Sequence, residues 1–435
     1  MDHGGREVGK NEAAAGRQQA VNHSIASDSP HQDPLVLDPT ARGRAAEEKA
    51  LHIADGPVLV DILGELAWAV ADPDLLKQFL SDSRFSKDPR QHWPRFIDGE
   101  IVGKWPLYLQ VSVDNMFTAY GSAHRRLRRL VAPTFSARRL DALLPSVRQN
   151  TEALLDGLGE RTEPVVDLRK AYAVQLPVRV ISELLGVPED MRLRFKETID
   201  RIWNTTLSPE DAMAATADVY DMLSDLIERK RANPADDMTT ALIGARDDEN
   251  GSTTLTAREL TDTLLLIIAA GYETTVNLID NAVTALLASP DQLAHVRAGR
   301  ATWSDVVEET LRYAAPVSHM PMRYAVEDVE VPGWGTIRKG DAVLPSFGAA
   351  SDSPKHQPSA RTFDVTRPDK SNVAFGYGTH FCLGAPLARA EGTTALAGLF
   401  ERFPDLELAV PVAELEPVAS ILGNGHTALP VRLRG

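Results

Sequence analysis

One stretch of this sequence decides its fold: Phe375-Gly376-Tyr377-Gly378-Thr379-His380-Phe381-Cys382-Leu383-Gly384. It holds the only cysteine among 435 residues, directly before the good helix formers of residues 385–400. Glycine has no Cβ, so a loop with three glycines can turn tightly and bring its backbone close to a flat object. A thiolate just before a helix gains from the helix dipole and from free amide donors, which should lower its pKa.

The single cysteine leaves three interpretations open. Most free cysteines are inert and buried, because cysteine behaves as a small hydrophobe. A nucleophilic Cys382 with His380 as its base would need the two side chains to face each other, which residues two apart in a loop do poorly. A ligand for haem iron suits the loop best, because Phe-x-x-Gly-x-x-x-Cys-x-Gly fixes four positions in a window of ten around this cysteine.

Composition and charge exclude several classes of protein. A lone cysteine excludes an intramolecular disulfide framework and any multi-cysteine zinc or iron–sulfur site within the chain, and it favours a reducing, cytoplasmic location. The formal net charge of -15 argues against binding to nucleic acid or an anionic membrane surface. The longest apolar run, residues 264–271, is too short to span a bilayer, so we expect no membrane segment.

Cap and breaker residues predict a mostly helical chain. Ser208-Pro209-Glu210-Asp211 places an N-cap, a proline and two acids at a helix start, and Pro234 ends that helix. Thr256-Ala257-Arg258-Glu259 is a capping box, and no breaker follows before Ser289-Pro290. The sequence therefore predicts a helix over residues 257–288, about 48 Å long at 1.5 Å per residue. With its apolar middle, such a helix must run through the centre of a globule.

The remaining patterns predict one domain with little sheet. Residues 1–33 have almost no large apolar side chains and are expected to form a disordered tail. Residues 34–435 show no linker and no internal repeat, which predicts a single domain. Strand-like sequence is confined to short pieces after residue 320, namely 325–331 and 342–347, with turns at 333–335 and 339–341. The expected fold class is mainly α, an α-rich α+β fold with a minor β region.

The cysteine loop resembles the haem-binding loop of the cytochrome P-450 family of haem-thiolate monooxygenases, and other segments match the family in order along the chain. The resemblance implies a cytochrome P-450 fold, with haem b bound through Cys382, Phe375 and Gly376. Glu309-Thr310-Leu311-Arg312, on a helix predicted to begin near Trp303, and the later Arg367 are similar to the family's buried Glu/Arg/Arg network. Alone, a Glu-x-x-Arg pair is usually a solvated surface pair.

Further family positions concern oxygen and the haem propionates. Ala270-Gly271-Tyr272-Glu273-Thr274-Thr275, in the middle of the long helix, resembles the family's oxygen-binding groove. Thr274 would hydrogen-bond dioxygen, and Glu273 would help deliver protons through water; otherwise the threonine simply bonds back to the preceding turn. The resemblance assigns four contacts to the two propionates: His124, Arg128, Arg323 and His380.

Substrate contacts can be assigned only by region. The segment from residue 93 to 117 carries aromatic and apolar side chains that are larger than those usual in a surface loop, although half of them could pack in the core. The resemblance adds positions on the long helix, after the Glu-x-x-Arg helix and near the C-terminus. The predicted substrate residues are Trp93, Phe96, Ile101, Phe117, Ala269, Ala270, Val317, Met320, Ile421 and Leu422.

A local reversal of charge predicts a docking surface. No acidic residue occurs between Asn115 and Leu140, whereas arginines accumulate there. By the resemblance the partner is an acidic ferredoxin or flavodoxin with its reductase, docking near Arg125, Arg126 and Arg129. The chain shows no dinucleotide or Walker loop, so we expect electrons to come from outside, and we expect a monomer.

The function implied is a soluble, bacterial, most closely actinobacterial-type monooxygenase of secondary metabolism. It would use O2 to hydroxylate or epoxidise an apolar small molecule such as a steroid, terpenoid or macrolide. Two rivals remain: an oxidative cross-linking or peroxide-driven enzyme of the same fold, and a non-catalytic haem-binding sensor. The adjacent acid and alcohol at Glu273 and Thr274 favour oxygen activation over both.

Overall fold

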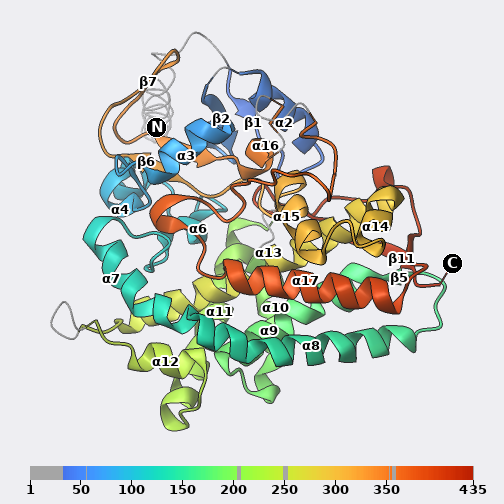
Figure 1. The fold of residues 1–435 in the computed structure, drawn as a ribbon. Helices are drawn as coiled ribbons and strands as arrows, with labels where there is room; N and C mark the ends of the chain where they lie inside the picture. The colour runs from blue at the N-terminus through green and yellow to red at the C-terminus, as the bar shows by residue number, and fades with distance from the viewer. Residues whose placement is uncertain are drawn as a thin grey trace, which may run out of the picture.

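The computed structural model describes residues 33–54, 56–202, 207–247, 253–351, 353–354 and 359–434, so the predicted tail falls almost entirely outside the described residues. Helices dominate the molecule, and a sheet region lies at one side of it (Figure 1). This arrangement confirms the mainly α fold class. The α-helices are α2 (Arg44–Ile53), α3 (Pro73–Ser81), α4 (Pro89–His92), α5 (Pro94–Ile97), α6 (Tyr108–Ser112), α7 (Gly121–Val131), α8 (Ala137–Gly159), α9 (Gln175–Leu185), α10 (Arg192–Ile202), α11 (Pro209–Ala232), α12 (Met238–Gly244), α13 (Ala257–Ala288), α14 (Pro290–Arg297), α15 (Trp303–Tyr313), α16 (Phe347–Ser351) and α17 (Ala385–Arg402).

Short helical turns and strands complete the described part of the chain. The turns are η1 (Ala132–Phe135), η2 (Arg169–Ala173, of π type), η3 (Glu189–Met191), η5 (Gly378–His380) and η6 (Val412–Glu414). The strands are β1 (Leu35–Val36), β2 (Val58–Ile62), β3 (Glu65–Val70), β4 (Phe85–Ser86), β5 (Val166–Asp167), β6 (Arg323–Ala325), β7 (Val329–Val331), β8 (Gly335–Ile337), β9 (Ala342–Pro345), β10 (Glu407–Leu408) and β11 (Pro430–Arg432).

Helix α13 is the centre of the fold, and its bounds are those predicted from the sequence. Thr256 and Glu259 form the expected capping box at its start. Helices α9, α11, α15 and α17 all pack against it, and its apolar side chains belong to the largest core cluster. By length and composition α13 could also cross a bilayer, but 72% of its most apolar window is buried in the protein. Its apolar character therefore reflects a central core helix.

Cap signals also placed other helices correctly. Ser208 accepts a hydrogen bond from the Asp211 N–H at the start of α11, and α15 begins at Trp303 behind a capping box of Thr302 and Asp305. These signals depend only on residues close in the chain, so they can be read from the sequence alone.

The prediction that the sheet lies only after residue 320 was wrong. Within the described residues, a six-stranded sheet has the order β1-β2-β3-β9-β6-β4, so strands from the first quarter of the chain form two thirds of it. Strands β2 and β3 make a hairpin through Leu63 and Gly64, whose φ values are 57° and 94°. Because both strands are largely buried, they lack the alternation of polar and apolar residues that reveals a half-exposed strand.

The C-terminal strand prediction was partly right. The turns at Gly333 and Gly340 are present, with φ values of 78° and 88°. The predicted strand 325–331 is broken, however, since β6 joins the large sheet and β7 pairs with β8 in a separate ribbon. Strand β9 pairs in parallel with β3 and antiparallel with β6, which ties the N-terminal hairpin to the segment that follows α15.

Candidate functional site

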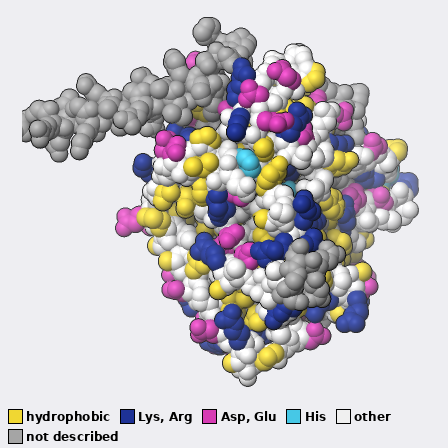
Figure 2. Space-filling model, turned by 90° about the vertical axis from the view of Figure 1, so that its left-hand side faces the viewer, with side chains coloured by type: hydrophobic (Ala, Val, Ile, Leu, Met, Phe, Trp, Pro, Cys, Tyr) yellow, Lys and Arg dark blue, Asp and Glu magenta, His cyan; other side chains and the backbone are white. Residues whose placement is uncertain are grey.

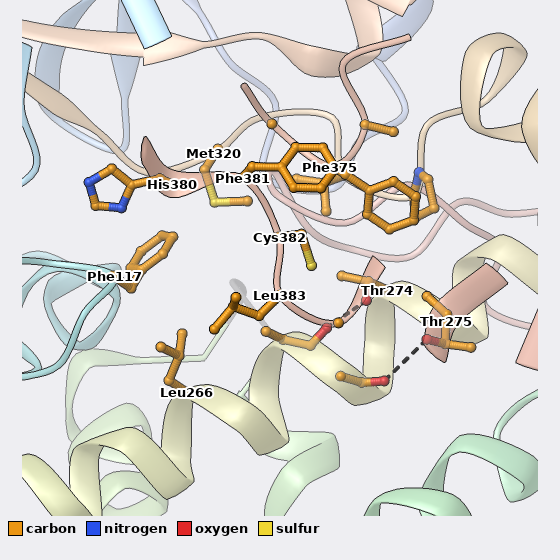
Figure 3. A pocket seen from close by; sticks show the side chains of 18 of the residues that line it. Phe117, Leu266, Thr274, Thr275, Met320, Phe375, His380, Phe381, Cys382 and Leu383 are labelled. Atoms are coloured by element: carbon orange, nitrogen blue, oxygen red, sulfur yellow. Dashed lines mark hydrogen bonds between the residues drawn. The ribbon is translucent and has the colours of Figure 1, made fainter. Parts of the chain in front are cut away.

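The cysteine loop makes the tight turns that its glycines predicted. The Cys382 N–H donates to the Phe375 carbonyl at 3.0 Å, and Gly376 and Gly378 both have positive φ, at 76° and 71°. A Cβ on Gly378 would lie 2.9 Å from the backbone oxygen of Leu80, so only glycine fits there. The loop then enters α17 at Ala385. Figure 3 shows the Cys382 sulfur directed towards α13.

A largely apolar cavity of about 240 Å³ lies at this loop. Several parts of the chain enclose it, among them the loop 374–384 with the start of α17, one face of α13, side chains from α9, the segment before α7 and the segment 316–323. Helix α13 contributes residues three and four apart, which lie on one face of a helix. These are Leu266, Ile267, Ala270, Gly271, Thr274, Thr275 and Leu278.

Two opposing effects act on the pKa of the Cys382 thiol, which is half-buried at the wall of the cavity. Burial is the largest effect and raises its pKa above the ordinary value. The N–H groups of Gly384 and Ala385 and the positive charge of Arg128 act in the opposite direction. The N–H donors expected at the start of α17 are therefore present. The prediction that they lower the pKa of Cys382 was wrong for the protein without a cofactor, because desolvation of the thiolate outweighs the donors. A cation such as haem iron would supply the missing positive charge.

Basic side chains gather at one edge of the cavity, two of them arginines and two of them histidines. Arg128, Arg323 and His380 line it, and the His124 ring lies 4.1 Å from the His380 ring, centroid to centroid. Burial lowers the pKa of Arg323 to about 10 and that of His124 to about 4. His124 Nε2 is buried without a hydrogen-bond partner.

This cationic edge fits the propionates of haem b. Within the described part of the chain, no carboxylate forms an ion pair with Arg128 or Arg323, whose side chains donate instead to the backbone oxygens of Phe381, at 2.7 Å, and of Phe85, at 3.2 Å. Buried charges need partners of opposite sign, and the two carboxylates of haem would provide them. The four predicted propionate contacts thus lie together at one edge of the cavity that Cys382 also lines.

The two predicted catalytic residues lie on different faces of α13. Thr274 lines the cavity, and its hydroxyl donates to the Ala270 carbonyl at 2.6 Å (Figure 3). Thr275 makes the same kind of contact with the Gly271 carbonyl at 3.2 Å. Glu273 is buried but does not line the cavity. Sequence adjacency therefore did not bring the acid and the alcohol to the same surface, since consecutive helical residues point about 100° apart.

Glu273 instead belongs to a buried polar network centred on Arg169. Arg169 donates to Glu273 Oε1 at 2.7 Å, to Asn277 Oδ1 at 3.0 Å and to Asp280 Oδ2 at 2.8 Å. The three acceptors are spaced i, i+4 and i+7, so they share one face of α13. The His426 ring lies 2.9 Å from Asp280 Oδ1 through its Nδ1 atom and is partly exposed. No sequence pattern pointed to Arg169, which is more than 100 positions away.

A second buried network joins Glu309, Arg312 and Arg367. Arg312 makes a two-pronged contact with Glu309, with both nitrogen–oxygen distances at 2.8 Å, and Arg367 Nε lies 3.2 Å from Glu309 Oε1. The Asp364 N–H also donates to Glu309. Glu309 and Arg312 are almost completely buried, so this is no solvated surface pair.

The predicted substrate residues divide into two groups. Four of them line the cavity: Phe117, Ala270, Val317 and Met320. Trp93, Ile101, Ile421 and Leu422 are instead buried together in a second core cluster against the sheet, and Phe96 packs on that cluster. Ala269 does not line the cavity either. Large aromatic residues in this segment therefore mostly fill a core: Trp93 stacks on Tyr324 at 5.2 Å, measured between ring centroids.

Several lining residues were missed by the sequence analysis. Pro177, Ile181 and Leu184 come from α9, and Met116 lies beside Phe117. A Cβ on Gly271 would lie 2.9 Å from Ile181 Cδ1, so this glycine lets α9 approach α13 closely. Lys87 and Glu391 also line the cavity, although neither belongs to a recognisable motif. Burial raises the pKa of Glu391 to about 8, and its Oε2 atom has no hydrogen-bond partner.

Two of the three arginines predicted to dock a partner are already paired with acidic side chains of this chain. Arg126 is paired with Glu259, and Arg129 lies 2.9 Å from Asp247, so acids from distant segments neutralise both. Arg125 is exposed. Figure 2 shows the side of the molecule that lies at the left in Figure 1, where Lys and Arg side chains are spread with Asp and Glu between them. The docking role of this region stays a prediction.

Comparisons with known proteins agree with the site. Residues 303–412 match the family model described as Cytochrome P450. The chain is 41% identical to 2-hydroxy-5-methyl-1-naphthoate 7-hydroxylase of Streptomyces carzinostaticus, over 92% of this chain and 98% of that protein. It is 40% identical to 6-deoxyerythronolide B hydroxylase of Saccharopolyspora erythraea, over 86% and 92%. The solved structure of CYP154A1 from Streptomyces coelicolor A3(2) is 54% identical and superposes with a TM-score of 0.87, over 92% of this chain and all of that chain.

Proposed function

The chain belongs to the cytochrome P450 family and is a monooxygenase with haem b as its cofactor, and from this we propose that it hydroxylates or epoxidises an apolar small molecule such as a steroid, terpenoid or macrolide. One observation carries the proposal: a mostly apolar cavity extends from Cys382 across one face of α13 to α9. Apolar walls with few polar groups bind ligands mainly by excluding water.

Each part of the cavity has a proposed task. Haem b, when bound, supplies the activation of O2. Cys382 would hold the iron, while Arg128, Arg323, His124 and His380 would hold the propionates. Phe375 and Gly376 would support the cofactor from the loop. Ile181, Leu184 and Met116 would position the substrate and exclude water from it.

Thr274 is the polar side chain that we propose to act on the oxygen side of the cavity. Its hydroxyl bonds to the Ala270 carbonyl at 2.6 Å, and it could exchange this partner for a bound ligand or water by rotating about χ1. Glu273 could take part in proton delivery only by leaving Arg169 or through water, because its carboxylate is bonded on another face of the helix. We therefore assign the direct role to Thr274 and a supporting one to Glu273.

We propose that a separate acidic protein, a ferredoxin or flavodoxin with its reductase, delivers the electrons. The exposed Arg125, next to the proposed propionate contact His124, supports docking on α7, while Arg126 and Arg129 would first have to exchange their own acidic partners. Docking strength should then fall as ionic strength rises.

A spin-state screen tests the substrate class. The purified holoprotein is titrated with steroids, terpenoids and macrolides, and a low-to-high-spin shift of the haem spectrum reports binding. Each ligand found is then incubated with a ferredoxin, its reductase and NADPH, and the products are analysed by mass. A product heavier by one oxygen atom is expected. Binding without any product under several ferredoxins would favour the sensor, and product formation only with peroxide would favour the peroxide-driven enzyme.

A further inference from the structure

Lys87 is a fully buried ammonium group in the wall of the cavity. It lies between β4 and α4, only 5% of its surface is exposed, and its side chain reaches the cavity. Its Nζ atom donates to the Pro321 carbonyl at 2.6 Å and lies 3.6 Å from the centroid of the Phe117 ring. A carbonyl and a ring face each stabilise an ammonium, but neither carries a negative charge.

The sheet places a second cation beside Lys87. Strands β4 and β6 pair antiparallel, with Phe85 opposite Ala325 and Ser86 opposite Tyr324. Extending this register by one residue brings Lys87 opposite Arg323, which is also buried and lines the cavity. Like charges directly opposite on a sheet repel each other, so this position is unfavourable without an anion between them. Burial and the charge of Arg323 accordingly hold the pKa of Lys87 well below its ordinary value.

Among the described residues, no carboxylate offsets this pair of charges. No acidic side chain affects the pKa of Lys87 or of Arg323. The carboxylate of the neighbouring Asp88 instead accepts hydrogen bonds from the Arg90 N–H and from the Gln91 side chain. A lysine has three donors, and a single carbonyl accepts only one of them. Burying an ammonium is costly unless it is paired, so an anionic ligand is the missing partner.

We propose that Lys87 is a carboxylate-binding residue of the cavity, beside Arg323. The carboxylate could belong to a haem propionate or to the substrate. Arg128, Arg323, His124 and His380 would hold the two propionates, which leaves Lys87 available to either source. The second source rests on the proposed function and would extend it to substrates that carry an acid group. The name of one relative, a naphthoate hydroxylase, describes such a molecule.

The first arm of the test measures haem retention and needs no substrate. Haem transfer from the holoprotein to apomyoglobin is timed for the unaltered chain, Lys87→Met, Lys87→Arg and the exposed-lysine control Lys104→Met. Methionine keeps an unbranched apolar stem only one atom shorter than lysine, so this buried site should still fold, which the carbon monoxide spectrum checks. If the carboxylate is a propionate, Lys87→Met loses haem about tenfold faster or more. Lys87→Arg should retain much of the stability, and Lys104→Met should match the unaltered chain.

The second arm measures ligand binding by the same four proteins. Spin-state titrations with 1-naphthoate and the neutral 1-naphthamide compare an acid with an uncharged analogue of the same shape. If the carboxylate is the ligand's, Lys87→Met weakens 1-naphthoate binding about tenfold relative to 1-naphthamide, with haem retention unchanged. If neither probe binds the unaltered protein, the haem-transfer measurement alone tests the proposal. The proposal would be overturned if Lys87→Met kept haem as well as the unaltered chain and also kept the same preference for 1-naphthoate over 1-naphthamide. It would equally be overturned if haem retention were unchanged and neither probe bound. Because the haem arm uses no substrate, a wrong substrate class would not produce that result.

Discussion

Arg169 Nη2 lies 2.7 Å from Glu273 Oε1, so the acid next to the cavity threonine is held on another face of α13. The same guanidinium reaches Asp280 at 2.8 Å, and both acids are almost completely buried. One arginine therefore fastens the π-type turn η2 to the middle of the central helix. The strength of this attachment and the course of proton delivery can be tested separately.

Replacing Arg169 should destabilise the fold. Arg169→Met leaves two buried carboxylates without their cation, and breaking such a pair typically costs about 3–5 kcal/mol. Urea unfolding of the holoprotein, followed by circular dichroism, measures the change. Arg125→Met, which removes an exposed arginine, serves as the control and should stay within about 0.5 kcal/mol of the unaltered chain. An Arg169→Met protein as stable as that control would show that the network contributes little.

Thr274→Val should impair the use of O2. The substitution keeps the shape of the side chain and removes the hydroxyl that bonds to the Ala270 carbonyl in the cavity. We expect product formed per O2 consumed to fall about tenfold or more, in line with typical losses when a positioned proton-handling group is removed. Activity driven by hydrogen peroxide should change little. Equal losses with O2 and with peroxide would contradict a role in proton delivery.

Two neighbouring alanines on α13 offer a matched pair for the substrate cavity. Ala270 lines the cavity, whereas Ala269 does not. Ala270→Phe should fill the space beside Thr274 and weaken ligand binding about tenfold or more, because the larger side chain occupies volume that the ligand needs. Spin-state titration with any ligand from the screen measures this, and haem content should be unchanged. If Ala269→Phe has the larger effect, the lining of α13 has been assigned to the wrong face.

Glu391 should make stability depend on pH. Its pKa in the folded protein is about 8, against 4.5 for an ordinary glutamate, so the folded chain binds this proton more tightly than the unfolded chain does. The stabilising contribution is complete below pH about 4.5 and is lost as pH rises to about 8, by at most about 1.4 kcal/mol per pH unit. Urea unfolding at several pH values should show a steeper decline for the unaltered chain than for Glu391→Gln. Parallel declines would mean that Glu391 is ionised throughout.

Cys382→Ser tests the iron ligand. Serine keeps the size of the side chain but cannot supply a thiolate, so the red-shifted Soret band of the reduced carbon monoxide complex should disappear together with monooxygenase activity. Some haem should remain, because the cationic edge of the cavity is unaltered. A variant that kept the red-shifted band would show that another residue binds the iron.

Local sequence signals predicted the parts of this protein whose structure depends on near neighbours in the chain. Helix α13 begins and ends where Thr256 and Ser289 indicated, and Gly376 and Gly378 turn the cysteine loop as expected. The hairpin of β2 and β3 escaped prediction because its buried strands lack alternation, and its parallel partner β9 lies more than 270 positions away. Register across such a distance leaves no local pattern.

The sequence by itself determined the turns of the cysteine loop and the start of the helix after it, because glycines and helix starts act over a few residues. It also predicted Cys382 as the iron ligand. Only the tertiary structure decided the partner of each polar side chain. It placed Glu273 against Arg169, away from Thr274, and it set the buried Lys87 opposite Arg323 at the cavity. The physical reason is that the groups within a few ångströms of a buried polar side chain are set by packing, and those groups come from distant parts of the chain.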